Sequence, residues 1–578
     1  MTARLDQLRF PDETKLGLAL LVGYMMLDAS QTFSLGGWHL LLWLTGATPS
    51  MWQAGALQLF MVVALSVVLM GWRIRLSLKG LQLRCIEEAD AKASRETDYL
   101  GSRIAQGRAK FFVTANMGDA NAFCMWTGKV SWIVLGGGLR LLFRKDAARA
   151  RAIVAHECAH VDAGDTQYLL VAWHVFNAYA ILTIGGLLLM QVRFWLGAPE
   201  VQPALRSGGP GLIDLLEQNF THVLRNGIPA LIVLASLAFV LRHLARLREY
   251  RADERAAQAG LRQPLVDILS ALVPQMSQPG WRRFFAFHPT TDERAKRLSN
   301  ESRWGRADLL FIGALAFLGV RISEHFERAG EGPVPATANF EDMMAFLVRS
   351  MAADPLAVAS TVLSIAILFI AVVNVYRASA TQVKLGATLR SRLLVVLPAS
   401  VALFLGSLAG DLTSWGLLMR PGHASRSWGW IDVVDSAFFS AALATMAGVF
   451  LLLGVSLVAS RMLRHVRRPG WGQLWKLSWW TLLVALVLQL GANIVGGLVG
   501  LAMGGGLGEW DVSWLPRSSM QVVPGFPSLL QTFVGLSLAV VALQAFRLWP
   551  GRARQAVPRV DTSWLVKEQG SLAPMPLI

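Results

Sequence analysis

Long apolar stretches constrain this chain more than any other feature. An uncharged or nearly uncharged segment of about 20 residues crosses the hydrocarbon core of a bilayer, about 30 Å thick, as a helix. About ten such stretches lie along the 578 residues, at 16–35, 54–72, 168–192, 228–241, 309–322, 356–376, 393–412, 437–459, 477–498 and 529–548. The fourth and fifth are short and need flanking residues to cross. With 54% hydrophobic and 16% charged residues, the chain is predicted to be an α-helical polytopic membrane protein of about ten spans.

Lys and Arg are concentrated in alternate loops between these stretches. Nine of them lie within 73–110, whereas the loop 36–53 has none. Later basic clusters fall on the same side, at 242–255, 377–392, 461–468 and 547–559. Because basic loops stay in the cytoplasm, these loops and both termini are predicted to be cytoplasmic. The same distribution accounts for the net charge of +16, so we expect no nucleic-acid partner.

The segment 151–160 contains the pattern H-E-x-x-H, formed by His156, Glu157 and His160. A helix brings residues four apart onto one face, so both imidazoles can reach one metal ion. Zinc held in this way keeps room for a third protein ligand and a water, and an adjacent carboxylate can take a proton from that water. The polar lead-in 144–152 favours a helix start. The pattern predicts a helix with two zinc ligands and Glu157 as catalytic base.

A third ligand is expected in the charged run 248–255, which follows the fourth apolar stretch. Glu249 is the candidate, and Asp253 lies one helical turn later, where its carboxylate can hydrogen-bond a ligating histidine. Asp165, five residues after His160, is a candidate for the same task. Taken alone, a run of this kind is also typical of a solvated charged helix. The predicted centre holds one Zn²⁺ per chain.

The three cysteines, Cys85, Cys124 and Cys158, all lie in the region predicted to be cytoplasmic. Thiols stay reduced there, so we expect no disulfide. Cys158 lies two residues from each motif histidine and is predicted to point away from their shared face.

Polar residues also occur within the predicted spans, at Asp28, His174, Asn177, Asn374, Asp411 and Asn493. Such groups are costly in lipid and should face protein or water. Packing between helices is the simplest role for them. Alternatively, Asp28 or Asp411 lines a cavity through which a membrane substrate approaches.

Four motifs together resemble those of the HtpX-type and CAAX-prenyl-protease-type membrane zinc metallopeptidases. They are H-E-C-A-H with Asp165, then E-Y-R-A-D at 249–253, Asn121-Ala122-Phe123-Cys124 followed by a strand-like segment 129–135 and Gly-Gly-Gly-Leu139, and H-P-T-T-D-E-R at 288–294. Cys124 stands where the family has Ala. The resemblance covers about 98–298 with the two preceding spans, and the motifs occur in the family order.

This resemblance implies a cytoplasmic α+β zincin-type (gluzincin) protease domain. It implies an active-site helix that runs into the third span near Tyr168, and a small antiparallel sheet whose edge strand, at 129–135, binds an extended peptide. Asn121, Ala122 and Phe123 are then expected to contact substrate. His288 either donates a hydrogen bond to the oxyanion or caps a turn, and Arg294 is expected to form a structural salt bridge.

The predicted organisation has four parts. Residues 1–72 hold two transmembrane helices, 73–305 the protease domain interrupted by two more, 306–549 a membrane domain of about six helices, and 550–578 an exposed tail. The leading function is a zinc-dependent endopeptidase that cleaves cytoplasm-facing segments of membrane or misfolded proteins. Its partners are a polypeptide substrate and the lipid bilayer, and by analogy its location is a bacterial inner membrane.

Two other functions remain open at this point. One is maturation of a defined substrate, such as a lipidated C-terminus. The other is a sensor-transducer that resembles BlaR-type receptors, because the spans after about residue 306 offer a switching module with an outward segment at 323–355. A catalytically dead scaffold predicts eroded ligands, and none is eroded.

Overall fold

The computed structural model describes residues 13–31, 51–79, 82–116, 118–119, 121–127, 130–197, 210–272, 286–299, 309–329, 398–399 and 401–410. These residues divide into two compact units. The helical unit takes its described residues from 1–69, 172–243 and 304–549, and the α/β unit takes them from 70–171 and 244–303. The predicted spans at 356–376, 437–459, 477–498 and 529–548 and the tail lie outside the described residues.

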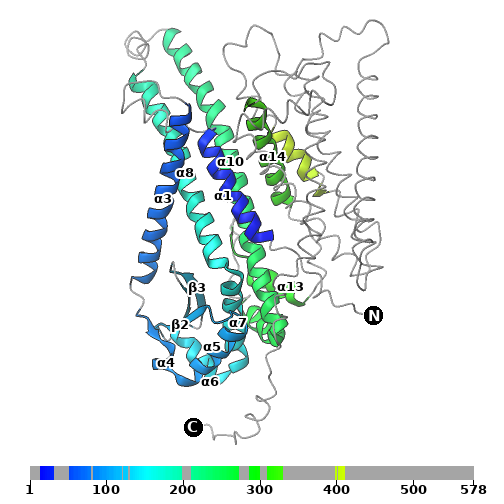
Figure 1. Ribbon diagram of the computed structural model, residues 1–578. Helices are drawn as coiled ribbons and strands as arrows, with labels where there is room; N and C mark the ends of the chain where they lie inside the picture. The colour runs from blue at the N-terminus through cyan, green and yellow to red at the C-terminus, as the bar shows by residue number, and fades with distance from the viewer. Residues whose placement is uncertain are drawn as a thin grey trace, which may run out of the picture. The chain divides into compact units, whose positions relative to one another are not determined.

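The longest helices are α3 (Met51–Leu78), α8 (Asp165–Gly197) and α10 (Pro210–Ala256), which Figure 1 shows with the shorter α1 (Glu13–Gln31) and α14 (Leu309–Ala329). Within the described residues, three helical segments are long and apolar enough to cross a membrane: Gln53–Leu78, Asp165–Leu196 and Gly227–Ala271. Shorter apolar helices cover Gly17–Ala29, Leu309–Arg321 and Val401–Gly410. The part of the chain that the structure describes is therefore mostly helical, with three candidate membrane-spanning helices. The fourth predicted span gains its length from its flanks, because α10 continues well beyond 228–241.

Two polar residues noted in the predicted spans are buried in the helical unit, and Asn177 on α8 is partly buried. Asp28 on α1 is 1% exposed and accepts a hydrogen bond from the Tyr179 hydroxyl on α8. His174, also on α8, is buried. Of the polar residues noted in the predicted spans, Asn374, Asp411 and Asn493 lie outside the described residues. For Asp28, the contact with Tyr179 supports a role in helix packing.

The α/β unit contains a mixed four-stranded sheet in the order β1-β2-β4-β3. Its strands are β1 (Arg84–Cys85), β2 (Ala109–Val113), β3 (Ala122–Trp126) and β4 (Ser131–Leu135). Strands β3 and β4 form an antiparallel hairpin, and β4 inserts beside β2 in parallel register. Two predictions are therefore wrong: the sheet is not wholly antiparallel, and the strand expected at 129–135 lies inside it. Because the hairpin places β4 against β2, β3 with its Ala122-Phe123-Cys124 sequence lies at one edge of the sheet formed by the described residues, and β1 lies at the other.

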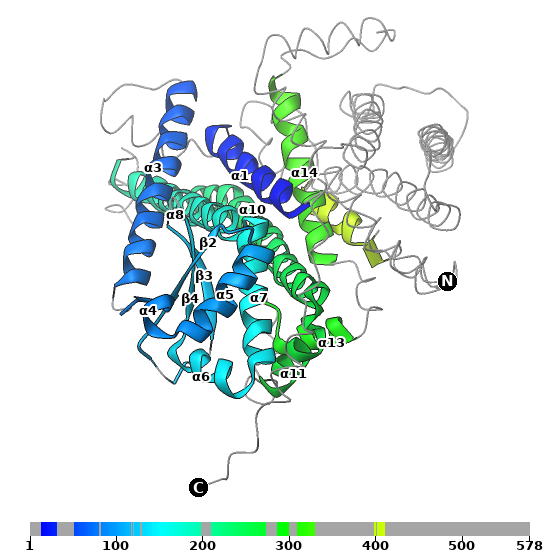
Figure 2. The same ribbon diagram turned by 60° about the horizontal axis from the view of Figure 1, so that its bottom comes forward.

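Helices pack beside this sheet, as Figure 2 shows for α5 and α7, with α11 and α13 beyond α7. The helices of the unit are α4 (Ile86–Ala89), α5 (Ala91–Arg103), α6 (Gly137–Lys145), α7 (Ala147–Ala163), α11 (Arg262–Leu272) and α13 (Thr291–Ser299). Their apolar faces and β4 share one core, which includes Leu100, Ile133, Leu139, Val154, Leu265 and Leu298. Burial of these side chains fixes α7 between the sheet and α11.

Helix α7 carries the H-E-x-x-H motif, so the helix predicted there is confirmed. Asp146 caps its N-terminus by accepting a hydrogen bond from the backbone N–H of Arg149. Gly164 ends it in the left-handed region, with a φ of 70°. The expectation that this helix runs into the third span is wrong, because the chain turns at Gly164 and α8 starts anew at Asp165.

A glycine pair anchors the loop that leads into β3. A Cβ atom on Gly136 would lie 2.1 Å from the carbonyl oxygen of Asp119, and one on Gly137 would lie 2.7 Å from that of Asn116. Gly136 also donates its N–H to the carbonyl of Asn121, over 2.8 Å. Only glycine allows this close approach, which holds the start of the edge strand against the turn that follows β4.

A buried ion pair holds α5 against α7. Both Arg151 and Glu96 are buried, and Arg151 donates to the two Glu96 oxygens over 2.8 and 2.6 Å. Replacing Glu96 by Ala leaves a buried guanidinium without its counter-charge, so we expect the variant to lose about 3–5 kcal/mol of unfolding free energy. Thermal unfolding in detergent measures the loss. Glu87→Ala, at an exposed position on α4, is the control. An unchanged melting temperature for Glu96→Ala would show that the pair contributes nothing.

Candidate metal centre

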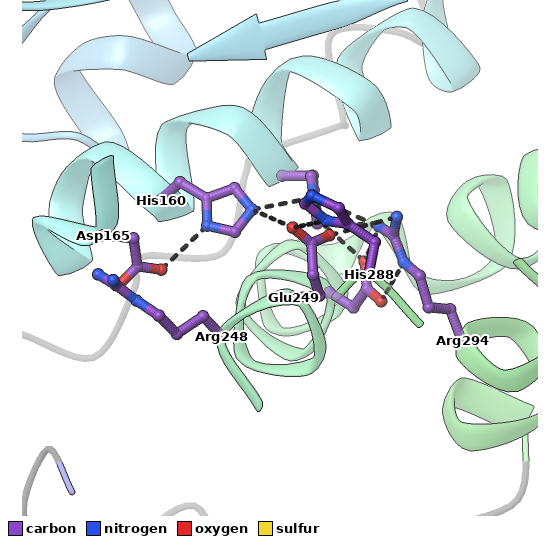
Figure 3. Close-up of polar contacts among 8 residues, drawn as sticks. His160, Asp165, Arg248, Glu249, His288 and Arg294 are labelled. Atoms are coloured by element: carbon purple, nitrogen blue, oxygen red, sulfur yellow. Dashed lines mark hydrogen bonds and ion pairs between the residues drawn. The ribbon is translucent and has the colours of Figure 1, made fainter. Parts of the chain in front are cut away.

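Three potential metal ligands converge on one point. Among the described residues, His156, His160 and Glu249 form one group whose ligand atoms all lie within 4.8 Å of one another. The two Nε2 atoms are 3.2 Å apart, and they lie 3.5 and 3.6 Å from the Glu249 carboxylate oxygens. Figure 3 shows His160 on α7 and Glu249 on α10 facing each other across this point. Side chains far apart in sequence thus form one cluster.

The spacing of these atoms suits a tetrahedral ion. With metal–ligand bonds of about 2.0–2.2 Å, ligand atoms at the corners of a tetrahedron are separated by about 3.3–3.6 Å. The two Nε2 atoms are 3.2 Å apart, and each lies 3.5 or 3.6 Å from a different oxygen of the Glu249 carboxylate, which is close to this range. Two imidazoles and a carboxylate are also a donor set that zinc commonly takes. The residues present therefore fit a zinc ion.

Each of the two histidines contacts a carboxylate, and each of these carboxylates accepts a hydrogen bond from an arginine. His156 Nδ1 lies 2.9 Å from Asp253 Oδ1, and Asp253 accepts hydrogen bonds from Arg294. On the other side, His160 Nδ1 lies 2.9 Å from Asp165 Oδ2. A carboxylate only accepts, so each Nδ1 donates and each Nε2 is left with its lone pair toward Glu249.

The acidic groups around His156 raise its pKa and so favour its protonated form in the metal-free protein. Burial and the Arg294 guanidinium act to lower the pKa of His156, but the Asp253 and Glu249 carboxylates outweigh them and raise it to about 9. A metal ion must displace this proton, so binding is expected to release it.

This shift predicts how the stability of the metal-free protein depends on pH. The pKa of His156 rises from 6.5 in the unfolded chain to about 9 on folding, so its stabilising effect is complete below pH 6.5 and disappears as pH rises to about 9. With a chelator present, the melting temperature should fall over this window, and His156→Gln should flatten the fall. Excess zinc should remove it, because zinc takes neutral imidazole. A wild-type curve that matches the His156→Gln curve would refute the assignment.

Glu157 lies beside the edge strand. Its side chain is on α7, which packs against β3, and the residue is 9% exposed. Burial and the neighbouring Glu157 carboxylate raise the pKa of the Cys124 thiol, so the third residue of β3 borders this carboxylate. Cys158, in contrast, is fully buried in the core, and all three cysteines are free thiols. The expected orientation of Cys158 agrees with this burial.

The other candidate site residues lie either against Glu249 or along β3. His288 lies against the cluster: its Nδ1 is 3.2 Å from Glu249 Oε1, while its side chain is 75% exposed. Hydrogen bonding to Glu249 outweighs burial and raises the pKa of His288. Ala122 and Phe123 begin β3, with Phe123 exposed, and Asn121 precedes them in an exposed turn closed by Asp119. The structure therefore brings the metal-ligand candidates together and sets the substrate candidates along the edge strand.

Sequence reasoning missed Arg248, which is 1% exposed and donates a hydrogen bond to Asp165 Oδ1. It also missed the pairing of Arg255 with the buried Asp162. Both arginines lie in the charged run 248–255, for which a solvated helix was the competing interpretation. The sequence did contain a signal for these contacts. Asp162 and Asp165 closely follow the zinc motif, and carboxylates that become buried need cationic partners.

The comparisons with known proteins agree with the motifs. Residues 91–302 match Peptidase family M48. "Protease HtpX homolog" of Chlorobium phaeobacteroides strain DSM 266 is 28% identical over 198 residues, which is 32% of this chain and 63% of that protein. "Protease HtpX" of Alcanivorax borkumensis is 26% identical over 209 residues, again 32% and 63%. The chain thus spans less than two thirds of the length of these relatives. No solved structure matches it.

The matched range contains every residue of the metal cluster. It also contains the two arginine–carboxylate pairs that contact the histidines, Arg248–Asp165 and Arg294–Asp253. The four motifs that suggested the resemblance also lie within it. The predicted likeness to HtpX-type proteins is therefore confirmed, over the residues 91–302 that match Peptidase family M48.

Proposed function

We propose that this protein is a membrane-bound zinc metalloendopeptidase. The observation that carries the proposal is the convergence of His156, His160 and Glu249 at tetrahedral spacing, with Glu157 one residue after the first ligand. That arrangement combines a metal with a general base, which is the equipment of peptide-bond hydrolysis. The match of residues 91–302 to a peptidase family supports the same reaction.

Each residue has a defined task in this proposal. His156, His160 and Glu249 hold one zinc ion, which when bound supplies a Lewis acid for the scissile carbonyl and its attacking water. Glu157 accepts the proton of the water and passes it to the leaving amide nitrogen. His288 reaches the site from an exposed position and donates a hydrogen bond to the carbonyl oxygen as negative charge develops.

The substrate lies as an added strand along β3. An edge strand offers unpaired backbone groups, and an extended peptide can pair with them irrespective of its side chains. Phe123 is exposed on this strand and Cys124 borders Glu157, so a peptide paired here passes the general base. This supports cleavage of unfolded or extended segments. Asn121, Ala122 and Phe123 are the residues proposed to contact it.

The proposed location of this chemistry is the inner surface of a membrane. The proposal includes about ten spans, cytoplasmic termini, a protease domain at 73–305, a membrane domain at 306–549 and a tail at 550–578. It rests on the basic loops and on the three apolar helices among the described residues. Cytoplasm-facing segments of membrane or misfolded proteins are then the substrates in reach, and a bacterial inner membrane is the expected location.

Metal removal tests the proposal. Purified protein in detergent should cleave an unfolded polypeptide such as casein, lose that activity on dialysis against a zinc chelator, and regain it with one equivalent of Zn²⁺. An equivalent of Mg²⁺, which prefers six oxygen ligands, should not restore it. Cleavage that survives removal of the metal would refute a zinc mechanism.

A further inference from the structure

We propose that Arg248 is a positioning residue for the metal ligand His160, and that it acts through Asp165. The proposal rests on the metal site of the preceding section but not on proteolysis. Arg248 belongs to no motif that suggested the function. It precedes Glu249 on α10, so one residue of this helix contacts the carboxylate beside His160 and the next is a candidate metal ligand.

The three side chains form a linear chain of contacts. His160 Nδ1 donates to Asp165 Oδ2 over 2.9 Å, and the other carboxylate oxygen of Asp165 accepts a hydrogen bond from Arg248. All three residues are buried, with exposed fractions of 8% for His160, 6% for Asp165 and 1% for Arg248. Figure 3 shows Arg248 on the far side of Asp165 from the histidine. It therefore contacts the carboxylate that in turn contacts the metal ligand.

The geometry of the Arg248 contact gives it a positioning role. A guanidinium bound to Oδ1 holds the Asp165 carboxylate in one orientation and directs Oδ2 at His160 Nδ1. Because Oδ2 accepts the hydrogen of Nδ1, the lone pair of Nε2 stays on the side of Glu249, where a metal ligand needs it.

Helix architecture explains why the cation comes from α10. His160 is on α7, Asp165 is the first residue of α8, and the turn at Gly164 separates them. Arg248 binds Asp165 from a third helix, so it fixes the start of α8 relative to the histidine. At the other ligand the contacts run in the same order: Arg294 binds the Asp253 carboxylate, and this carboxylate contacts His156. Both histidines are thus oriented by an arginine-held carboxylate.

Zinc affinity tests the role without reference to cleavage. The zinc dissociation constant of Arg248→Met, measured in detergent by competition with a chromophoric chelator, should rise about 10- to 100-fold, which is the usual cost of losing a group that orients a metal ligand. Arg248→Lys keeps the charge and should recover part of the affinity. The visible spectrum of the Co²⁺-loaded variant should differ from that of wild type, because the geometry of His160 changes.

Arg151→Met is the matched control, since Arg151 is an equally buried arginine that pairs with the Glu96 carboxylate away from the metal. It should lower the melting temperature of the metal-free protein and leave the zinc dissociation constant unchanged. Equal zinc losses in Arg248→Met and Arg151→Met would reduce Arg248 to a folding role and overturn the proposal. So would wild-type affinity in Arg248→Met. Arg248→Lys provides the same comparison if Arg248→Met fails to fold.

A double variant tests the route through Asp165. If Arg248 acts on His160 only by way of this carboxylate, Arg248→Met combined with Asp165→Asn should bind zinc no more weakly than Asp165→Asn alone. Additive losses would show a separate path and contradict the proposal. If wild type itself binds no zinc, the proposed function fails with it. If wild type binds zinc and the variants do likewise, only the role of Arg248 fails.

Discussion

Glu157→Gln should retain stoichiometric zinc and lose peptide-bond cleavage. The amide keeps the size of the side chain but cannot accept the proton of the attacking water, and general base catalysis is typically worth about 10²- to 10⁴-fold in rate. Glu157 is buried beside β3 on the helix that carries both histidine ligands, where a neutral isostere should cause little strain. Casein cleavage by zinc-loaded protein in detergent measures the loss.

Glu88→Gln, at an exposed position on α4, is the matched control and should cleave casein at the wild-type rate. Zinc content and melting temperature must be compared for all three proteins, so that loss of the base is separated from loss of the metal or the fold. Cleavage by Glu157→Gln within a few-fold of wild type would exclude Glu157 as the base.

Glu249→Ala should abolish stoichiometric zinc binding. Groups that merely orient a ligand are worth about 10- to 100-fold in metal affinity, so a group that bonds to the metal should be worth more than about 100-fold. The loss has an electrostatic part as well. Removing this carboxylate takes away one of the two negative groups beside Arg294, whose Nη1 lies 3.4 Å from Glu249 Oε2, so a cation at the metal position becomes less favourable.

Glu254→Ala provides the comparison on the same helix, five residues further along, and should bind zinc normally. Metal analysis after gel filtration gives the stoichiometry, and chelator competition gives the affinity. Wild-type affinity in Glu249→Ala would mean that a different side chain completes the centre, and it would remove the third ligand from the proposal.

The chemistry of the site could be predicted from the sequence because it depends on local spacing and on ligand type. His156 and His160 are four residues apart on a helix, and zinc needs a third ligand, which left Glu249 in the next charged run. The end of the motif helix had a signal too: Gly164 followed by Asp165 is typical of a left-handed helix end, yet the pattern was interpreted as a helix continuing into the third span.

The sheet order and the buried arginines could not be predicted in this way. Strand β4 pairs with β2 although β3 lies between them in the sequence. An apolar strand also has the same sequence pattern in the interior of a sheet as at its edge. Arg248 and Glu249 are adjacent on a helix and point about 100° apart, so no single helical face explains why Arg248 is buried while the Glu249 side chain is only 14% exposed. Only the position of Asp165 at the start of α8 supplies the reason.

Zinc K-edge X-ray absorption of the purified, zinc-loaded protein tests the metal centre most directly. The spectrum should show nitrogen and oxygen ligands alone at about 2.0–2.2 Å, with the multiple scattering of two imidazoles. A sulfur ligand at about 2.3 Å would place zinc on a cysteine instead, and absence of bound zinc would contradict the centre formed by His156, His160 and Glu249.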